Sequence, residues 1–334
     1  MPSLTEEIER LTLSSTPDPS RPAKRMLVIV NPYAATVSDR LRNLVVYALG
    51  GRYEVEAIDT QARGHATELC REAAEDGYDV VVAFGGDGTV NEAVNGLAGS
   101  RTPLTCLPGG STNVYCRVLG IPGEIVDATE HLLGMADRWA PRSVDLGTVN
   151  GRHFAFSAGV GLDASVVRRV DAHMHLKARL GPYYFTYAAV GTFVRRYLVR
   201  APRLLVTDGA HGGAGATEAL PGVTAVVQNA APYTYFQSRR IDVAEGATLN
   251  GGTLSAAVLG RASPLDMPTL LWRVFSRRAR VASHRQITTL EGLHELQVRS
   301  ADERPLPLQV DGDFIGEVDQ AHFRAWPGAL TVVS

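Results

Sequence analysis

The segment Val80–Thr89, VVVAFGGDGT, decides the fold class of this chain. Its first five residues are all apolar, which is typical of a strand buried on both faces of a parallel sheet. The glycines after Phe84 end the strand, and Thr89 with Glu92 fits a capping box that predicts the start of a helix. Free amides at a helix N-terminus favour an anion, so this loop is a candidate phosphate site, with a plain strand-to-helix turn as the alternative.

The sequence on either side of this segment repeats the same alternation. Apolar runs predict strands over residues 26–30, 54–58, 80–84 and 104–107, and apolar stripes at helical spacing predict helices over 41–48, 66–73 and 90–97. Strands that alternate with helices indicate an α/β domain with a parallel, doubly wound sheet. Ligands of such sheets bind at the carboxyl ends of the strands, where the glycine loop lies.

A second glycine loop, Pro108–Asn113, follows the next strand. Gly110, Ser111 and Asn113 add backbone amides and polar side chains, so two loops at neighbouring strand ends would hold an anion from both sides. Neither loop is a P-loop, because no Gly-Lys-Ser/Thr follows, and the glycine spacing differs from the dinucleotide fingerprint. Taken alone, the second loop is equally well explained as a plain turn.

The pattern changes after Val144. Turn signals such as Asn150-Gly151, Asn250-Gly251 and Asp311-Gly312 separate short strands and predict a second, largely antiparallel β domain of the β-sandwich type. We expect a flexible lead-in over residues 1–25, the α/β domain over 26–144 with 317–334, and the β domain over 145–316. Two helical stretches, around 182–200 and 265–280, interrupt the second domain.

Composition limits the possible partners of the 334-residue chain. A net charge of -2 gives no basic field for nucleic acid, so we expect no such partner. Three cysteines without metal spacing indicate reduced thiols in a cytoplasmic protein. The polar start shows no signal-peptide pattern, and no apolar run reaches the ~20 residues of a spanning helix, so any membrane contact is expected to be peripheral.

Several stretches resemble the diacylglycerol kinase catalytic-domain family, which includes bacterial lipid kinases and is related to sphingosine kinases. The resemblance is carried by the opening strand with Asn31-Pro32, the loop Gly85–Thr89 with its helix, Pro108–Asn113, Val144–Gly147 and Asp311–Asp313. It covers nearly the whole chain from Met26. The first glycine loop also occurs in NAD kinases, whereas its combination with the second loop is typical of lipid kinases.

The resemblance implies an ATP- and Mg²⁺-dependent kinase of a lipid hydroxyl, with diacylglycerol the expected substrate and phosphatidic acid the product. It implies that nucleotide contacts come from Asn31, Thr60, Gly85, Gly86, Asp87, Gly88, Thr89, Glu92, Gly110, Ser111 and Asn113. Asp87 and Asp145 match acidic positions connected to magnesium through a polar network. Asp313 matches the family's general base, with Asp87 as the second catalytic position.

The chain departs from the family pattern at three places. Asp313 stands where the family usually has Glu, so the carboxylate is one methylene shorter. No lysine follows Asn31-Pro32, and Ser111 and Val114 replace the usual Thr and Asp of the second loop. The stretch Leu249–Gly252 lacks the aspartates that hold a structural magnesium in some relatives, so we do not expect that metal here.

The two helical stretches of the second domain are candidates for contact with an anionic membrane. In the stretch around 265–280, apolar residues share one face, and Arg273, Arg277 and Arg280 lie largely on the other. Basic amphipathic helices of this kind bind lipid surfaces transiently. The alternative is a helix packed on the β domain, with arginines favoured near its C-terminus by the helix dipole.

Two other functions remain compatible with the sequence. One is a kinase of a soluble substrate, as in NAD kinases, and the other is a non-catalytic regulator that binds lipid or nucleotide. The sequence leaves the oligomeric state open, including a homodimer. It also leaves open whether Asp311-Gly312 with Asp313 is a catalytic motif or a hairpin turn alone.

Overall fold

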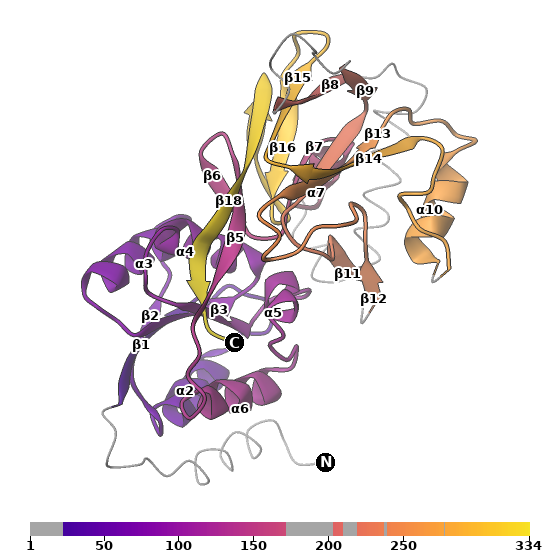
Figure 1. Ribbon diagram of the computed structural model, residues 1–334. Coiled ribbons are helices and arrows are strands. Elements are labelled where there is room, and N and C mark those ends of the chain that lie inside the picture. The colour runs from indigo at the N-terminus through magenta and orange to yellow at the C-terminus, as the bar shows by residue number, and fades with distance from the viewer. Residues whose placement is uncertain (1–22, 172–202, 210–218, 237–238, 277) are drawn as a thin grey trace. The chain divides into compact units, whose positions relative to one another are not determined.

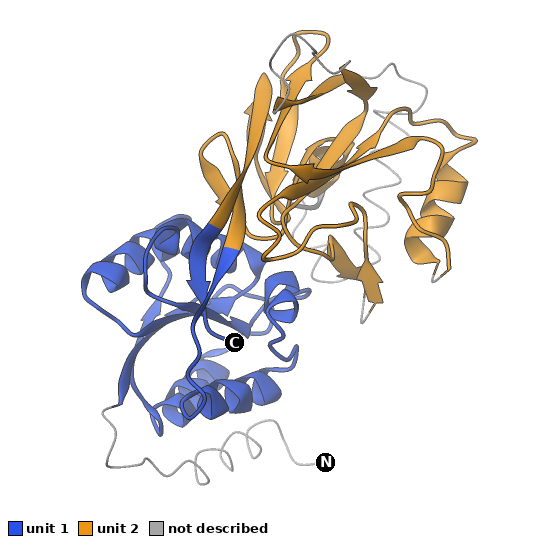
Figure 2. Cartoon of the chain, in the orientation of Figure 1, with its two compact units in different colours: residues 1–144, 328–334 blue, residues 145–327 orange. Residues whose placement is uncertain are grey.

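The computed structural model describes residues 23–171, 203–209, 219–236, 239–276 and 278–334 (Figure 1). The chain divides into two compact units, Met1–Val144 with Gly328–Ser334 and Asp145–Pro327 (Figure 2). The sequence places the return to the first domain at 317, whereas the units divide at Gly328. The reason is that the first half of β18 (Gln320–Val332) pairs with β15 (Glu295–Ser300). Most of the expected lead-in, residues 1–22, lies outside the described residues.

The first unit contains a parallel sheet in the order β2-β1-β3-β4. Its strands are β1 (Lys24–Val30), β2 (Tyr53–Asp59), β3 (Val80–Gly85) and β4 (Leu104–Pro108). The end of β18 runs parallel to β4, with Val332 beside Leu104. Every residue of β3 and β4 is buried, as expected for central strands covered on both faces.

Helices cover both faces of this sheet. They are α2 (Asp39–Leu49), α3 (His65–Glu75), α4 (Asp87–Leu97), α5 (Val114–Val118) and α6 (Ile125–Met135). Helices α3 and α4 pack together on one face, and α2 packs with α6 on the other (Figure 1). The spacing of Leu41, Val45 and Ala48 gives α2 its buried stripe, and the Ser38 hydroxyl caps its start by accepting from the Leu41 N–H. The predicted doubly wound α/β architecture is confirmed.

The second unit is an antiparallel β-sandwich, as predicted. One sheet has the order β14-β13-β10-β7-β16-β17, and the other contains β18, β15, β8 and β9, with β5 paired to β18 and β6 paired to β5. The strands not yet given bounds are β5 (Arg142–Val149), β6 (Arg152–Phe154), β7 (Ser157–Gly161), β8 (Leu204–Asp208), β9 (Leu220–Gly222), β10 (Thr224–Gln228), β13 (Leu254–Leu259), β14 (Ile287–Leu293), β16 (Leu306–Val310) and β17 (Asp313–Val318). Strands β11 (Thr234–Phe236) and β12 (Arg239–Ile241) form a separate pair.

Side chains from both sheets meet in the core of the sandwich. Phe154 of β6 and Phe323 of β18 are fully buried and meet edge to face, with ring centroids 6.3 Å apart. Val160, Val227 and Leu308 belong to the same cluster from the facing sheet. Two helices accompany the sandwich, α7 (Leu162–Asp171) and α10 (Met267–Phe275).

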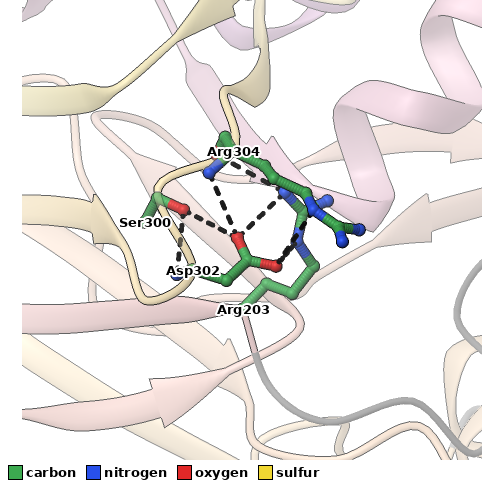
Figure 3. Close-up of polar contacts among 4 residues, drawn as sticks. All are labelled: Arg203, Ser300, Asp302 and Arg304. Atoms are coloured by element: carbon green, nitrogen blue, oxygen red, sulfur yellow. Dashed lines mark hydrogen bonds and ion pairs between the residues drawn. The ribbon is translucent and has the colours of Figure 1, made fainter.

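An ion-pair cluster fixes the turn between β15 and β16 (Figure 3). The Asp302 carboxylate accepts from Arg203 Nε at 2.9 Å, from Arg203 Nη2 at 3.2 Å and from the Ser300 hydroxyl at 3.0 Å. These contacts with Arg203 hold the pKa of Asp302 below its usual value. Because Arg203 immediately precedes β8, the cluster aligns β8 with the end of β15.

Candidate functional site

The first glycine loop joins a buried strand to a helix whose N-terminus has no side-chain cap. Strand β3 ends at Gly85, Gly86 is the extended N-cap, and α4 starts at Asp87. The expected capping box is wrong, because Thr89 and Glu92 both lie inside the helix. The N-cap residue Gly86 therefore contributes no side-chain acceptor to the first turn of α4, which suits an anion such as a phosphate group.

Asn31 connects the end of β1 to this helix. Its backbone N–H donates to the Phe84 carbonyl at 2.9 Å, and its Nδ2 donates to the Thr89 hydroxyl at 3.1 Å. A Cβ on Gly85 would lie 2.5 Å from the same hydroxyl, so glycine is needed where the helix turn approaches the strand. Thr60 lies at the end of β2, where its N–H donates to the Val30 carbonyl at 2.8 Å.

The second glycine loop packs directly on the first. A Cβ on Gly109 would lie 2.9 Å from the Gly85 Cα, and a Cβ on Gly110 would lie 2.8 Å from the Gly86 Cα. The Gly109 N–H donates to the Gly85 carbonyl at 2.9 Å. Two backbone segments can approach this closely only because neither carries a side chain on the facing surface.

Asn113 shapes the second loop from within. Its Oδ1 accepts from the Gly110 N–H, and its Nδ2 donates to the Gly110 carbonyl, both at 2.8 Å. The residue is buried and has a left-handed backbone, with φ 49°. Ser111 is exposed. Of these two predicted nucleotide ligands, Asn113 uses its side chain to build the loop, and Ser111 presents a hydroxyl at its surface.

Asp87 and Glu92 both bind neighbouring backbone. Asp87 Oδ1 accepts from the Tyr115 N–H at 3.1 Å, at the start of α5. Glu92 accepts from the Gly64 and Ala66 N–H groups at 2.8 and 3.2 Å, so it satisfies amides at the start of α3. Glu92 thus has a structural partner that the sequence did not indicate, and its contact with nucleotide stays a prediction.

The residues predicted to bind nucleotide converge on one edge of the sheet. Asn31, Thr60, the Gly85–Thr89 loop and the Gly110–Asn113 loop follow β1, β2, β3 and β4 respectively. Because the strands are parallel, their carboxyl ends share this edge. The edge offers backbone amides, the hydroxyls of Thr60, Thr89, Ser111 and Thr112, and the half-buried carboxylate of Asp87. This set suits an anionic ligand that binds together with a cation.

In the second unit, Asp145 is buried within β5 and supports a loop. Its Oδ2 accepts from the Gly252 N–H at 2.6 Å, and its own N–H donates to the Leu249 carbonyl at 2.7 Å. No group of three or more His, Cys, Asp or Glu that could hold a metal occurs among the residues that the structure describes. Asp145 as part of a magnesium network stays a prediction.

The motif Asp311–Asp313 forms the predicted hairpin turn between β16 and β17. Val310 pairs with Asp313, and the two central residues have φ 47° and 86°, the left-handed values of a two-residue hairpin turn. The buried Asp311 carboxylate accepts from the N–H groups of Ala155, Phe156 and Ser157 at 2.7, 3.0 and 3.1 Å. Asp311 is therefore an anchor of the turn, and Asp313 is the first residue of β17.

Three polar residues near this turn were missed by the sequence reasoning. Asp163 at the start of α7 accepts from the Tyr233 hydroxyl and, at 2.8 Å, from Gln309 Nε2. The Gln309 side-chain carbonyl in turn accepts a hydrogen bond from the Gly312 N–H in the hairpin turn. The sequence feature that could have pointed to Asp163 is the pair of glycines at 159 and 161, which lies just before it.

The candidate membrane helix α10 is shorter than predicted. It ends at Phe275 because Ser276 is extended, with ψ 140°, so Arg280 lies beyond the helix and not on its polar face. Arg280 forms an ion pair with Glu245, and Arg273 donates to the Arg280 carbonyl at 3.0 Å. Arg277 and the predicted helix at 182–200 lie outside the described residues. Within the described ranges, no helix is long and apolar enough to cross a membrane.

The three cysteines are buried free thiols, as predicted. Burial raises the pKa of Cys70 to about 12, because the thiolate would lose its hydration beside Glu92. These thiols are packed side chains of the α/β unit, and nothing in their setting indicates catalysis.

Comparison with known proteins bears on both units. Residues 25–164 match the model of the diacylglycerol kinase catalytic domain, and residues 156–334 match that of the YegS C-terminal NAD kinase beta sandwich-like domain. A diacylglycerol kinase of Bacillus subtilis (strain 168) is 37% identical over 164 residues, 47% of this chain and 52% of that protein. A diacylglycerol kinase of Staphylococcus aureus (strain JH9) is 32% identical over 166 residues, 48% of this chain and 51% of that protein.

The chain thus spans about half the length of the curated relatives it matches. Among solved structures, one described as a diacylglycerol kinase from Bacillus anthracis str. Sterne superposes with a TM-score of 0.69. The match has 23% sequence identity and covers 93% of this chain and 96% of that one. This likeness extends over both units and supports the fold.

Proposed function

Because the chain belongs to the diacylglycerol kinase catalytic-domain family with a YegS-type C-terminal domain, we propose that it is an ATP-dependent lipid kinase. The proposed reaction transfers the γ-phosphoryl group of ATP to the free hydroxyl of diacylglycerol and yields phosphatidic acid. The observation that carries the proposal is the backbone contact between the two glycine loops beside the start of α4. Backbone without side chains beside the amides of a helix N-terminus suits a polyphosphate.

In this proposal the α/β unit positions the nucleotide. The amides of Gly86–Thr89 would face the phosphates beside Gly110, whose own N–H is held by Asn113, while Asn31 holds the start of α4 in place through Thr89. Phosphoryl transfer depends mainly on such positioning and on stabilising charge, with little covalent chemistry from the protein. Ser111 supplies an exposed hydroxyl at the same loop.

The residues present also fit magnesium. Mg²⁺ usually binds one or two carboxylates together with waters and substrate phosphates, so it needs no cage of three acidic residues. Asp87 is a half-buried carboxylate at the phosphate loop and would hold the ion, with Asp145 proposed to act through a polar network. When bound, magnesium neutralises phosphate charge during transfer.

Asp313 is the proposed general base. It would take the proton of the lipid hydroxyl as that oxygen bonds to phosphorus and ADP leaves. The shorter side chain of Asp, compared with the usual Glu, is compatible with this role because the preceding turn fixes the backbone of Asp313. Asp311 is an unsuitable base, since its carboxylate already accepts three backbone hydrogen bonds.

An anionic membrane surface is the proposed place where the enzyme meets its lipid. Helix α10 supports this, because Trp272 is 61% exposed and Leu265, just before the helix, is 83% exposed. Arg273 lies in the last turn of the helix, and Arg278 follows the helix. Exposed aromatic and aliphatic side chains interleaved with cations suit the interface of an anionic bilayer. Arg280 contributes less, because Glu245 neutralises it.

The test uses the purified chain with labelled ATP, Mg²⁺ and either diacylglycerol in anionic vesicles or NAD. We expect label in phosphatidic acid, and a fall of about 100-fold or more in turnover for Asp313→Asn. Label in the dinucleotide would favour a soluble-substrate kinase, and nucleotide binding without turnover on any lipid would favour a regulator. Near-normal turnover of the folded Asp313→Asn variant would remove Asp313 as the base.

A further inference from the structure

A chain of side-chain hydrogen bonds runs from helix α7 to the acidic turn. The Tyr233 hydroxyl donates to Asp163 Oδ1, and Gln309 Nε2 donates to Asp163 Oδ2 at 2.8 Å. The other end of the Gln309 amide accepts from the Gly312 N–H at 2.9 Å. Gln309 is fully buried, so neither end of its amide can exchange its partner for water. The Gln309 amide therefore connects Asp163 to Gly312, so a shift of Asp163 would also move Gly312.

The sheet leaves room for this contact at one residue. Strand β7 lies between β10 and β16, and its Gly159 is opposite Gln309. A Cβ on Gly159 would overlap Asp163 Oδ2 and lie 2.8 Å from Gln309 Nε2. Only glycine allows the carboxylate of α7 to reach through to the neighbouring strand. The contact is therefore part of the sandwich and not an incidental surface approach.

The turn is held at both of its central residues, and from different elements. Asp311 is fixed by the backbone at 155–157, whereas Gly312 is fixed through Gln309. Both residues are left-handed, so the direction in which β17 leaves the turn depends on both anchors. Asp313 is the next residue, and its Cα position follows directly from that of Gly312.

Helix α7 supports the same hairpin at a second point. Arg168 donates to Glu317 of β17 at 2.6 Å, and its guanidinium lies 5.6 Å from the centre of the Phe314 ring. The Gln309 amide is bonded on one side to Asp163, which also accepts from Tyr233, and on the other side to Gly312, which lies between Asp311 and Asp313. Loss of hydration raises the pKa of Asp163, and its hydrogen bonds with Tyr233 and Gln309 oppose that rise.

We infer that Asp163, acting through Gln309, is a positioning residue that sets the orientation of Asp313 for proton transfer. The expected effect on catalysis rests on the proposed function. The expected effect on the position of the turn rests only on the chain of hydrogen bonds. A displacement of the order of 1 Å at a reacting group can cost about 100-fold in rate, so an anchor one residue away matters.

The first experiment compares Gln309→Met with Gln228→Met. Methionine keeps the size of glutamine without its hydrogen bonds. Gln228 is a matched control, because it is equally buried and its amide donates to the Ala230 carbonyl at 3.0 Å and accepts from the Ala244 N–H at 2.7 Å without contacting Asp163 or the turn. We expect Gln309→Met to lower kcat about tenfold or more with an unchanged KM for ATP, and Gln228→Met to leave kcat unchanged. Equal kcat values at equal folded fraction would overturn the inference.

The second experiment replaces Gln309 by glutamate and follows activity against pH. The introduced side chain, when protonated, can donate to Asp163 and accept from Gly312 as glutamine does, whereas two ionised carboxylates repel each other. The ratio of kcat for Gln309→Glu to kcat for the natural chain should therefore fall as pH rises through the raised pKa of the carboxyl pair. A ratio independent of pH would count against the chain of contacts, because a purely packing role has no such dependence.

A third measurement needs no activity. Amide exchange of the segment 310–314 should be faster in Gln309→Met and unchanged in Gln228→Met, because only the first variant frees the Gly312 N–H. If the natural chain phosphorylates no lipid but exchange changes as expected, the proposed function fails and the structural part of the inference stands. Unchanged exchange in Gln309→Met would overturn the inference whatever the activity.

Discussion

Gly110 lies so close to Gly86 that a Cβ on Gly110 would be 2.8 Å from the Gly86 Cα. Each of these residues belongs to a different loop, and the loops follow neighbouring parallel strands. The contact joins two backbones, so no side chain can rotate away to relieve a clash.

Replacing Gly110 by Ala should therefore displace one loop and lower kcat/KM for ATP by about 100-fold. Gly134→Ala is the matched control, because Gly134 lies within α6 and its nearest neighbour is the flexible Arg138 side chain at 3.3 Å. Alanine there should be neutral or slightly stabilising. Steady-state kinetics with both variants tests the expectation, and similar kcat/KM values would show that the loops do not form the phosphate site.

Asp311 and Asp313 should have separable roles although they are two residues apart. Asp311→Asn removes a charged acceptor from three buried N–H groups and should lower the free energy of unfolding by about 3 kcal/mol. Asp313→Asn should leave that free energy nearly unchanged while lowering turnover. Denaturant titrations of both variants measure the difference. If both variants lost equal stability, the assignment of Asp311 as the anchor would fail.

Glu92 should matter for the stability of the α/β unit. Its carboxylate accepts from the Gly64 and Ala66 N–H groups, whose positions at the start of α3 leave them without intrahelical partners. Glu92→Ala should cost about 1–2 kcal/mol, comparable to the loss of a helix cap. Thermal unfolding with and without ATP separates this effect from a nucleotide contact. A large loss of ATP affinity at unchanged stability would instead identify Glu92 as a nucleotide ligand.

The stability of the protein should fall as pH falls below the ordinary histidine value. Burial lowers the pKa of His153 below 6.5, where its ring stacks on Trp326 at 4.8 Å. Between these two pKa values the unfolded chain binds a proton at His153 and the folded chain does not. The contribution of neutral His153 to the free energy of unfolding is therefore present above pH 6.5 and is lost as pH drops toward the lowered pKa.

His153→Phe keeps a ring for the stack without the titration. The loss of unfolding free energy between about pH 6.5 and 5 should be smaller in this variant than in the natural chain. Urea titrations at both pH values measure it. Burial also lowers the pKa of His131 and His284, so part of the decline should remain. An identical decline in both proteins would exclude His153 as a contributor.

Trp272 should contribute to membrane binding. Trp272→Gln removes a 61% exposed aromatic side chain from α10 and should weaken binding to anionic vesicles by about tenfold or more. Tyr47→Gln is the control, because Tyr47 is 70% exposed on α2 of the other unit. Sedimentation with anionic and neutral vesicles gives the measurement. Equal binding of the two variants would place the membrane contact elsewhere.

Much of the fold could be predicted because the relevant signals are local. The apolar runs that end at Val30, Phe84 and Leu107 become buried parallel strands, and Asp311-Gly312 becomes the turn it indicates. The length of α10 could not be predicted, since the helix ends where the Ser276 backbone becomes extended in its tertiary setting. The predicted return of the chain to the first unit at residue 317 is too early. The reason is that β18 is one long strand, which pairs first with β15 and only at its end with β4.

The sequence by itself determined where the chain bends and which backbone could approach a phosphate, since glycine spacing and apolar periodicity are properties of neighbouring residues. Only the tertiary structure decided the partners of the polar side chains. Glu92 pairs with amides of another helix, and Gln309 meets Asp163, 146 residues away along the chain. Such contacts depend on strand order and on the space left by Gly159. The residues around Gln309 in the sequence predict neither of these.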